Sequence, residues 1–125
     1  MILGVGIDLL ENSRVEQELL RGKWLLNDGI FTPEEISRCS SKKKPALDYA
    51  ACFAAKEATL KALGFEVSDL GVFREVEVGL GGTNEYTVVL HQRLKAEAER
   101  LGVRRIHLSI AQSAHQTGAI VILEA

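Results

Sequence analysis

Asp8, Glu57 and Lys61 combine residue types and surroundings that suit phosphate chemistry. Asp8 follows the apolar run 1–7, whereas Glu57 and Lys61 lie one helical turn apart in an alanine-rich segment. If the two carboxylates converge, they supply two hard oxygen ligands. That is the usual protein share of a Mg²⁺ site, which waters and substrate phosphates complete. The lysines at 42–44 would then be available to offset further phosphate charge.

Each of these features also has a simpler interpretation. A glutamate four residues before a lysine is a common solvent-exposed helical pair, worth about 0.2–0.5 kcal/mol. Asp8 could be a turn acid at the end of a strand, and the lysines could form a solvated basic turn. The sequence contains no GxxxxGK, HExxH or GxSxG motif, and Gly4-x-Gly6 lacks the third glycine of a dinucleotide site. Spacing alone therefore leaves the choice open.

The elements that must position these residues follow from hydrophobic periodicity and helix-end signals. We expect helices over 11–21, from Thr32-Pro33 to Cys39, over 45–63 with Gly64 as the C-cap, and over 92–101. We expect strands over 1–7, 73–78, 86–90, 106–111 and 118–123, with a hairpin turn at 81–84. Gly4 and Gly6 suit a strand that another backbone approaches closely. Strands joined by hairpins predict an α+β fold, in which an antiparallel sheet packs on one long helix and shorter helices.

Composition narrows the class of protein further. The chain has 125 residues, of which 46% are hydrophobic and 26% charged, so we expect one globular domain over residues 1–125. A net charge of -2 argues against a general nucleic-acid binder. No apolar run approaches the roughly 20 residues of a membrane helix, and the apolar start lacks a basic leader. Cys39 and Cys52 have no metal or redox spacing, which favours two reduced thiols in the cytoplasm.

Two motifs together resemble a known family. Val5-Gly6-Ile7-Asp8, combined with Phe53-Ala54-Ala55-Lys56-Glu57-Ala58-x-x-Lys61-Ala62-Leu63-Gly64, resembles the signature of the holo-acyl-carrier-protein synthases, a family of 4'-phosphopantetheinyl transferases. Phe31-Thr32-x-x-Glu35 and Arg14 also resemble family segments, so the similarity extends over nearly the whole chain. The long-helix motif is specific, whereas Gly-Ile-Asp alone would be weak.

The resemblance implies an α+β phosphopantetheinyl transferase fold that assembles as a homotrimer, with an active site at each subunit interface. It implies transfer of the phosphopantetheine arm of coenzyme A to a serine of an apo-acyl carrier protein. The by-product would be adenosine 3',5'-bisphosphate. Such a transfer needs positioning and charge neutralisation more than covalent chemistry.

The resemblance also implies roles for individual residues. Asp8 and Glu57 would hold Mg²⁺ against the coenzyme A diphosphate, and Lys61 would neutralise phosphate charge. Glu57 would act as the base for the serine hydroxyl, directly or through a metal-bound water, and Arg14 would dock the acidic carrier protein. The residues expected to bind coenzyme A are Lys43, Lys44, Phe53, Lys56, Gly64, Ser109 and His115, with Lys56 as a second phosphate contact.

The chain departs from the family pattern at two instructive positions. Cys52 stands where most members have an arginine, and Gln112 stands where many have a histidine. His115 matches one branch of the family that places its histidine a few residues later. One alternative is therefore a catalytically weak relative that binds coenzyme A or a carrier protein without turnover. Another is a metal-dependent phosphodiesterase or nuclease, which the acidic net charge and the Glu-x-x-x-Lys spacing disfavour.

Overall fold

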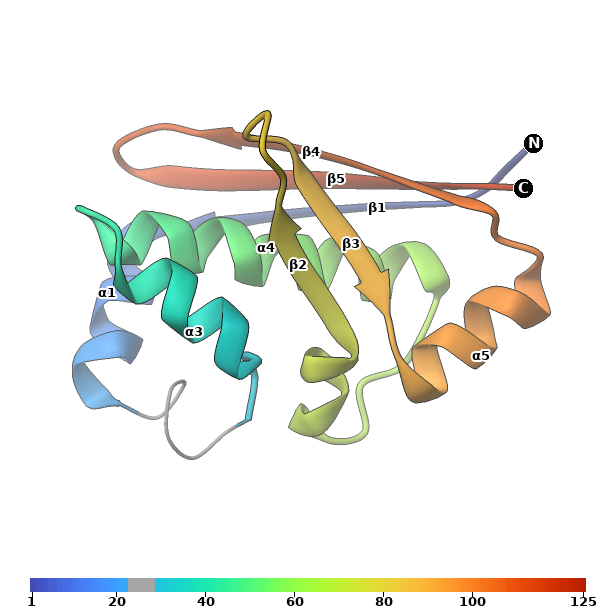
Figure 1. Cartoon of the computed structure of the whole chain (residues 1–125), viewed down its shortest axis with the longest axis horizontal. Coiled ribbons are helices and arrows are strands. Elements are labelled where there is room, and N and C mark those ends of the chain that lie inside the picture. Colours follow the sequence, from blue (N-terminus) through green and yellow to red (C-terminus); the bar gives the residue numbers. More distant parts are fainter. Residues whose placement is uncertain (23–28) are drawn as a thin grey trace.

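Helices and antiparallel strands build the chain, and the computed structural model describes residues 1–22 and 29–125 (Figure 1). A three-stranded sheet with the order β1-β5-β4 consists of β1 (Ile2–Glu11), β4 (Arg105–Gln112) and β5 (Gln116–Glu124). A separate antiparallel hairpin consists of β2 (Val76–Leu80) and β3 (Tyr86–Leu90). The helices are α1 (Asn12–Arg21), α3 (Pro33–Ser40), α4 (Pro45–Leu63), α5 (Gln92–Leu101) and the 3-10 helix η1 (Leu70–Glu75). This arrangement confirms the expected α+β class.

The long helix α4 forms the middle of the molecule. It packs against β1 and β5 on one side, and against α3 and β2 on the other (Figure 1). Because neighbours cover most of its surface, twelve of its nineteen residues are buried, and its six inner alanines keep those neighbours close. Pro45 begins the helix, and Gly64 ends it in the left-handed conformation (φ 65°). The expected bounds of this helix are therefore confirmed.

Two glycines bring β1 directly against α4. A side chain at Gly4 would overlap the carbonyl oxygen of Ala62, and one at Gly6 would overlap that of Ala58. The expected close approach of another backbone to this strand is confirmed, and α4 is that backbone. Because the contact moves from Ala62 at Gly4 to Ala58 at Gly6, β1 runs opposite to α4, and Asp8 is held beside the middle of the helix.

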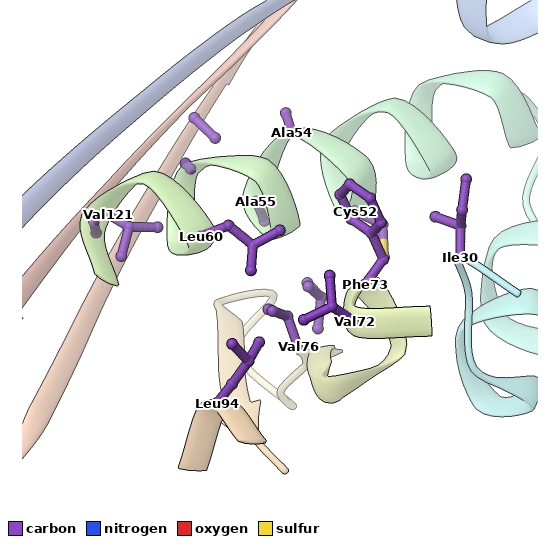
Figure 2. Close-up of a cluster of buried hydrophobic side chains, with 14 of the residues drawn as sticks. Ile30, Cys52, Ala54, Ala55, Leu60, Val72, Phe73, Val76, Leu94 and Val121 are labelled. Carbon is purple, nitrogen blue, oxygen red and sulfur yellow. The ribbon is translucent and has the colours of Figure 1, made fainter. Parts of the chain in front are cut away.

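The hydrophobic core lies around α4. Figure 2 shows Cys52, Ala55 and Leu60 from the helix, with Phe73 and Val76 facing them. The far side of α4 packs on inward-facing residues of β5 such as Val121, which is fully buried. No helix within residues 1–22 and 29–125 is both long and apolar enough to span a membrane.

Three sequence-based expectations need correction. The first strand does not end near residue 7 but continues to Glu11, so Asp8 lies inside the strand. Residues 73–75 belong to η1, and the first hairpin strand starts only at Val76. In the described part of the chain the strands form two separate sheets, one of three strands and one of two. The remaining elements agree with expectation to within two residues at each end.

Candidate active site

Asp8 and Glu57 meet, as predicted, where β1 crosses α4. Asp8 is 7% exposed, and its Oδ1 accepts a hydrogen bond from Lys61 Nζ at 3.0 Å. The same ammonium donates to the Ile7 carbonyl oxygen at 3.1 Å. Lys61 is thus an ion-pair partner of Asp8, a contact between two elements, whereas the simpler interpretation of the sequence was an exposed helical pair with Glu57.

The second carboxylate oxygen of Asp8 is unusual. Oδ2 is buried and meets no hydrogen-bond donor in the described part of the chain. The Glu57 carboxyl group lies against Asp8 and can donate to it only when it is protonated. Because an unsatisfied buried oxygen is costly, the two acids form a site that favours a proton or a cation.

The titration of Glu57 reflects this environment. Burial raises the pKa of the Glu57 carboxyl to about 7, and the hydrogen bond and charge of Asp8 contribute to this rise. The cationic Lys61 and Arg14 oppose the rise in pKa. At neutral pH the group is therefore divided between its acid and its carboxylate forms, which suits a residue that exchanges protons.

A cleft of about 430 Å³ opens at these acids. The α1 side of the cleft carries Arg14, and the opposite wall is apolar, with the rings of Phe53 and Phe73 at 5.5 Å between centroids. The remaining lining residues are Leu9, Leu10, Glu11, Val15, Ile30 and Leu70. Of the residues predicted from sequence, the structure brings together Asp8, Arg14, Phe53 and Glu57 in this cleft, with Lys61 bonded to Asp8.

Other predicted residues lie away from the cleft within one chain. Lys43 and Lys44 are exposed just before α4, and Gly64 is exposed at its far end. Ser109 is exposed on β4 and lines a shallow apolar depression on the outer face of the sheet. His115 is exposed in the turn between β4 and β5, where its carbonyl oxygen accepts from Asn12 N at 2.9 Å.

The prediction that Lys56 contacts a phosphate is wrong. Its side chain is fully buried on the side of α4 that faces α3 and β2. There its ammonium forms an ion pair with Glu35 and donates to two backbone carbonyl groups, so no donor is left for a substrate. A lysine in an alanine-rich helix resembles a surface residue in sequence, and only its distant partner shows otherwise.

The two departures from the family pattern are also structural. Cys52 is fully buried beside Cys39, and the thiol of Cys39 has a lowered pKa chiefly because Cys52 hydrogen-bonds to it. Gln112 Nε2 donates to the Leu47 carbonyl oxygen at 2.6 Å and contacts Thr117 Oγ1 at 3.0 Å, and so joins β4 to the start of α4. Neither side chain lines the cleft at Asp8 and Glu57.

Sequence reasoning missed part of the cleft wall. Leu70 and Phe73 line the cleft from η1, and Ile30 lines it from the segment before α3. The alternation of large and charged residues predicts a strand that starts at Phe73. In the structure Phe73 instead lies in the 3-10 helix η1. One signal against a strand in this segment was Leu70-Gly71, because a glycine next to an apolar residue weakens a strand pattern.

Comparison with known proteins shows the family to which the chain belongs. The family description "4'-phosphopantetheinyl transferase superfamily" matches residues 4–117. The holo-[acyl-carrier-protein] synthases of Koribacter versatilis (strain Ellin345) and Geobacter sp. (strain M21) are each 40% identical over 124 residues, which is 99% of both chains. The chain therefore belongs to the 4'-phosphopantetheinyl transferase superfamily, as its motifs indicated.

Solved structures within the same family have the same fold. A holo-[acyl-carrier-protein] synthase from Neisseria meningitidis matches with a TM-score of 0.87 at 28% identity, over 100% of both chains. The synthase from Bacillus anthracis, solved in complex with coenzyme A (3',5'-ADP), matches with a TM-score of 0.79 at 28% identity, over 100% of this chain and 98% of that one. These four relatives are holo-[acyl-carrier-protein] synthases.

Proposed function

We propose that this chain transfers the 4'-phosphopantetheine group of coenzyme A to a serine of apo-acyl carrier protein. A bond forms between the serine oxygen and the pantetheine phosphorus, and adenosine 3',5'-bisphosphate leaves as the diphosphate bond breaks. The observation that carries this proposal is the meeting of Asp8, Glu57 and Lys61 at the mouth of a cleft. These are the positions that the family motifs predicted.

The residues of the site fit a divalent cation. Asp8 Oδ2 is buried without a donor, and burial together with the neighbouring Asp8 raises the pKa of the Glu57 carboxyl, so a cation between the two acids would relieve an unfavourable environment. Within the described residues, no three His, Cys, Asp or Glu side chains gather as a metal site, so the protein offers only a partial ligand set. Such a set suits Mg²⁺, which keeps waters and substrate phosphates as ligands. When bound, Mg²⁺ would neutralise the diphosphate and orient it for in-line attack.

The side chains around the acids have complementary tasks. The Glu57 carboxylate can take the proton of the serine hydroxyl near neutral pH, because its pKa is about 7. The Lys61 ammonium is anchored by Asp8 yet half exposed, so it can also meet a phosphate oxygen. Arg14 is exposed at the cleft and can attract an acidic carrier protein, which predicts a rate that falls with salt.

A homotrimer would complete the site. Lys43, Lys44, Gly64, Ser109 and His115 lie outside the cleft within one chain, so we propose that a second subunit brings some of them to it. Exposed apolar residues on the outer face of β1 support self-association, because monomers rarely leave such a patch uncovered. The unbridged thiols, Cys39 and Cys52, support a reducing, cytoplasmic location.

Mass spectrometry tests the activity directly. The protein is incubated with coenzyme A, Mg²⁺ and an apo-acyl carrier protein, and we expect the carrier to gain the mass of the phosphopantetheine arm. Asp8→Ala and Glu57→Ala should each lower the rate at least about a hundredfold, because each removes a metal ligand and Glu57 is also the base. Glu99→Ala, on the exposed surface of α5, is the matched control and should keep the wild-type rate.

Several outcomes would contradict the proposal. No added mass with several carrier proteins, together with coenzyme A binding in a calorimeter, would support the binding-only alternative. Full activity of Asp8→Ala would remove the site from the mechanism. Cleavage of nucleic acid or of a phosphodiester with Mg²⁺ or Mn²⁺ would instead favour the hydrolase alternative.

A further inference from the structure

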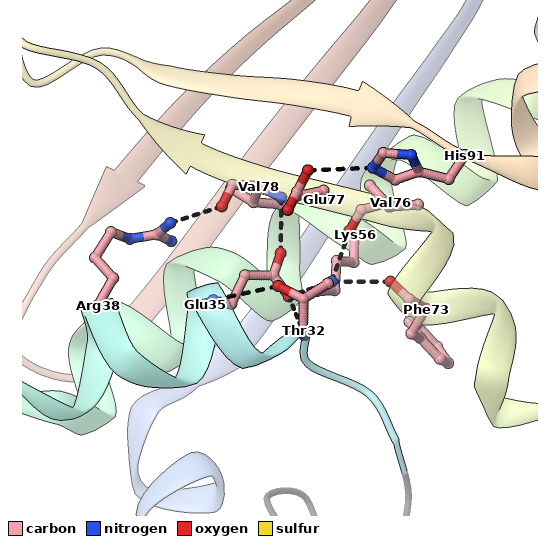
Figure 3. A network of polar contacts seen from close by, with 9 residues as sticks. All are labelled: Thr32, Glu35, Arg38, Lys56, Phe73, Val76, Glu77, Val78 and His91. Carbon is pink, nitrogen blue, oxygen red and sulfur yellow. Dashed lines mark hydrogen bonds and ion pairs between the residues drawn. The ribbon is translucent and has the colours of Figure 1, made fainter.

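Lys56 and Glu35 form a fully buried ion pair that the chemistry at Asp8 does not use. Lys56 Nζ lies 2.8 Å from Glu35 Oε1, and both side chains have no exposed area (Figure 3). Lys56 Nζ also donates to the Phe73 carbonyl oxygen at 2.8 Å and to the Val76 carbonyl oxygen at 2.6 Å. The three donors of the ammonium group are thus all used.

Glu35 is bound as completely as its partner. Its Oε1 accepts from the Thr32 backbone N–H at 2.8 Å, and the Thr32 hydroxyl accepts from the Glu35 N–H, which forms a capping box at the start of α3. Its Oε2 accepts from the Val78 N–H at 2.7 Å. One ion pair therefore joins α4 to three other segments, namely the start of α3, the end of η1 and strand β2.

Two of these segments carry the apolar wall of the cleft. Phe73, whose carbonyl group binds Lys56, lines the cleft with its ring, and Leu70 lies one turn earlier in η1. Ile30 lies two residues before Thr32, whose N–H binds Glu35. Phe53 completes this wall from α4, three residues before Lys56. The ion pair thus lies directly behind the wall that faces the acids.

Stability alone is a weak reason for such a pair. Burying two charges costs several kcal/mol of desolvation, and replacing a buried pair with apolar residues of similar volume is often neutral or stabilising. Apolar residues would lose five directed contacts. These are the ion pair itself, the two hydrogen bonds from Lys56 to backbone carbonyl groups, and the two from backbone N–H groups to Glu35. The pair is therefore better suited to fixing where segments lie than to adding net stability.

We propose that Lys56 and Glu35 are positioning residues, which hold the wall formed by Ile30, Leu70 and Phe73 at the distance from Asp8 and Glu57 that coenzyme A requires. This inference rests on the proposed function, because it takes the cleft to be the substrate site. The wall touches substrate away from the reacting phosphorus. Its displacement therefore weakens substrate binding more than it slows the chemical step.

The test compares variants that remove both charges together. Glu35→Gln/Lys56→Met leaves no unpaired buried charge, and the introduced glutamine keeps one oxygen for a backbone N–H. We expect its KM for coenzyme A, and the Kd from calorimetry, to rise about tenfold while kcat changes less than about threefold. Glu35→Gln/Lys56→Gln also leaves no buried charge, and its amide groups can still hydrogen-bond to backbone groups, so it should show a smaller rise and can be measured if the first variant does not fold.

A matched control separates positioning from stability. Leu123 is fully buried on β5 beside Gly4, remote from the wall, so Leu123→Ala should lower the thermal midpoint without changing KM or Kd for coenzyme A. If the folded pair variants bind coenzyme A within about twofold of wild type, the inference is overturned. If wild type binds coenzyme A but transfers nothing, the proposed function fails, while the Kd values still decide whether the pair positions the wall.

Discussion

Asp8 and Glu57 lie against each other, so the charge of Asp8 makes ionisation of the Glu57 carboxyl less favourable. Asp8 stays close to Lys61 at 3.0 Å, whereas no hydrogen-bond donor of the described chain reaches its second oxygen. Glu57 carries the consequence, because burial and the neighbouring acid raise its pKa to about 7. The proposed chemistry thus depends on a carboxyl group whose ionised form is disfavoured by its surroundings in the fold.

The titration of Glu57 predicts how stability varies with pH. An unfolded chain ionises this group near the ordinary glutamate pKa of 4.5, and the folded chain does so at about 7. Between these values the folded state holds the extra proton, so the free energy of unfolding falls as pH rises and stays lower above 7. Glu57→Gln should therefore be more stable than wild type at about pH 8, with a smaller difference at about pH 5.

Thermal denaturation without divalent cations measures this effect. Glu99→Gln is the control, because Glu99 is exposed on α5 and the same atom is replaced. A stability difference for Glu57→Gln that stays the same across this pH range would show that the group titrates normally, and the raised pKa would be wrong.

At the scale of the elements, the site depends on how closely β1 approaches α4. Gly6 lies against the carbonyl group of Ala58, which neighbours Glu57, and Asp8 comes two residues later in the strand. A strand pushed away from the helix would carry Asp8 away from Glu57 and Lys61. The absence of a side chain at Gly6 is therefore part of the site, although Gly6 has no reactive group.

Gly6→Ala tests this dependence. The new methyl group would overlap backbone atoms that cannot move aside, so we expect a loss of about 1–3 kcal/mol or more in unfolding free energy, together with a lower transfer rate. Gly81→Ala in the turn between β2 and β3 is the control, because its Cβ would lie 3.6 Å from the Glu85 carbonyl oxygen, an ordinary contact. Denaturant unfolding compares the two, and equal effects of both variants would contradict the expected role of Gly6.

The same scale explains what the sequence could predict. The helix 45–63 was predictable because Pro45, the alanines and Gly64 are local signals. The proposed roles of Asp8, Glu57 and Lys61 came from the resemblance to family motifs, because spacing alone also allowed a turn acid and an exposed helical pair. The Lys56–Glu35 pair could not be predicted, because its two residues lie 21 positions apart and nothing in the sequence around Lys56 indicates that this lysine is buried. The continuation of β1 beyond residue 7 depends on pairing with β5 as far as Gln116, which is far more distant in sequence than the partners of the ion pair.

At the scale of the whole molecule, the outer face of the three-stranded sheet is apolar. Val5, Ile7 and Leu9 on β1 are exposed by 55%, 66% and 67%, and they lie on the side of the strand opposite α4. Ser109 and Ala111 on β4 border the same surface. This face is the surface that the proposed homotrimer would cover.

Val5→Lys should therefore weaken self-association. Burying an unpaired ammonium group in an apolar interface is costly, so we expect sedimentation to show smaller species and the transfer rate to fall with them. Val89→Lys is the matched control, because Val89 is similarly exposed (50%) on β3 and lies away from this face. A wild-type protein that sediments as a monomer at every concentration would exclude the homotrimer.

The alternation of side chains along β1 has a further consequence. Ile7 and Leu9 point outward while Asp8, between them, points toward α4. Only one backbone therefore separates the proposed contact surface between copies from Asp8, the proposed metal ligand. Any neighbour that bends or straightens this strand also moves the carboxylate, so dilution that separates the copies would alter the reaction centre itself.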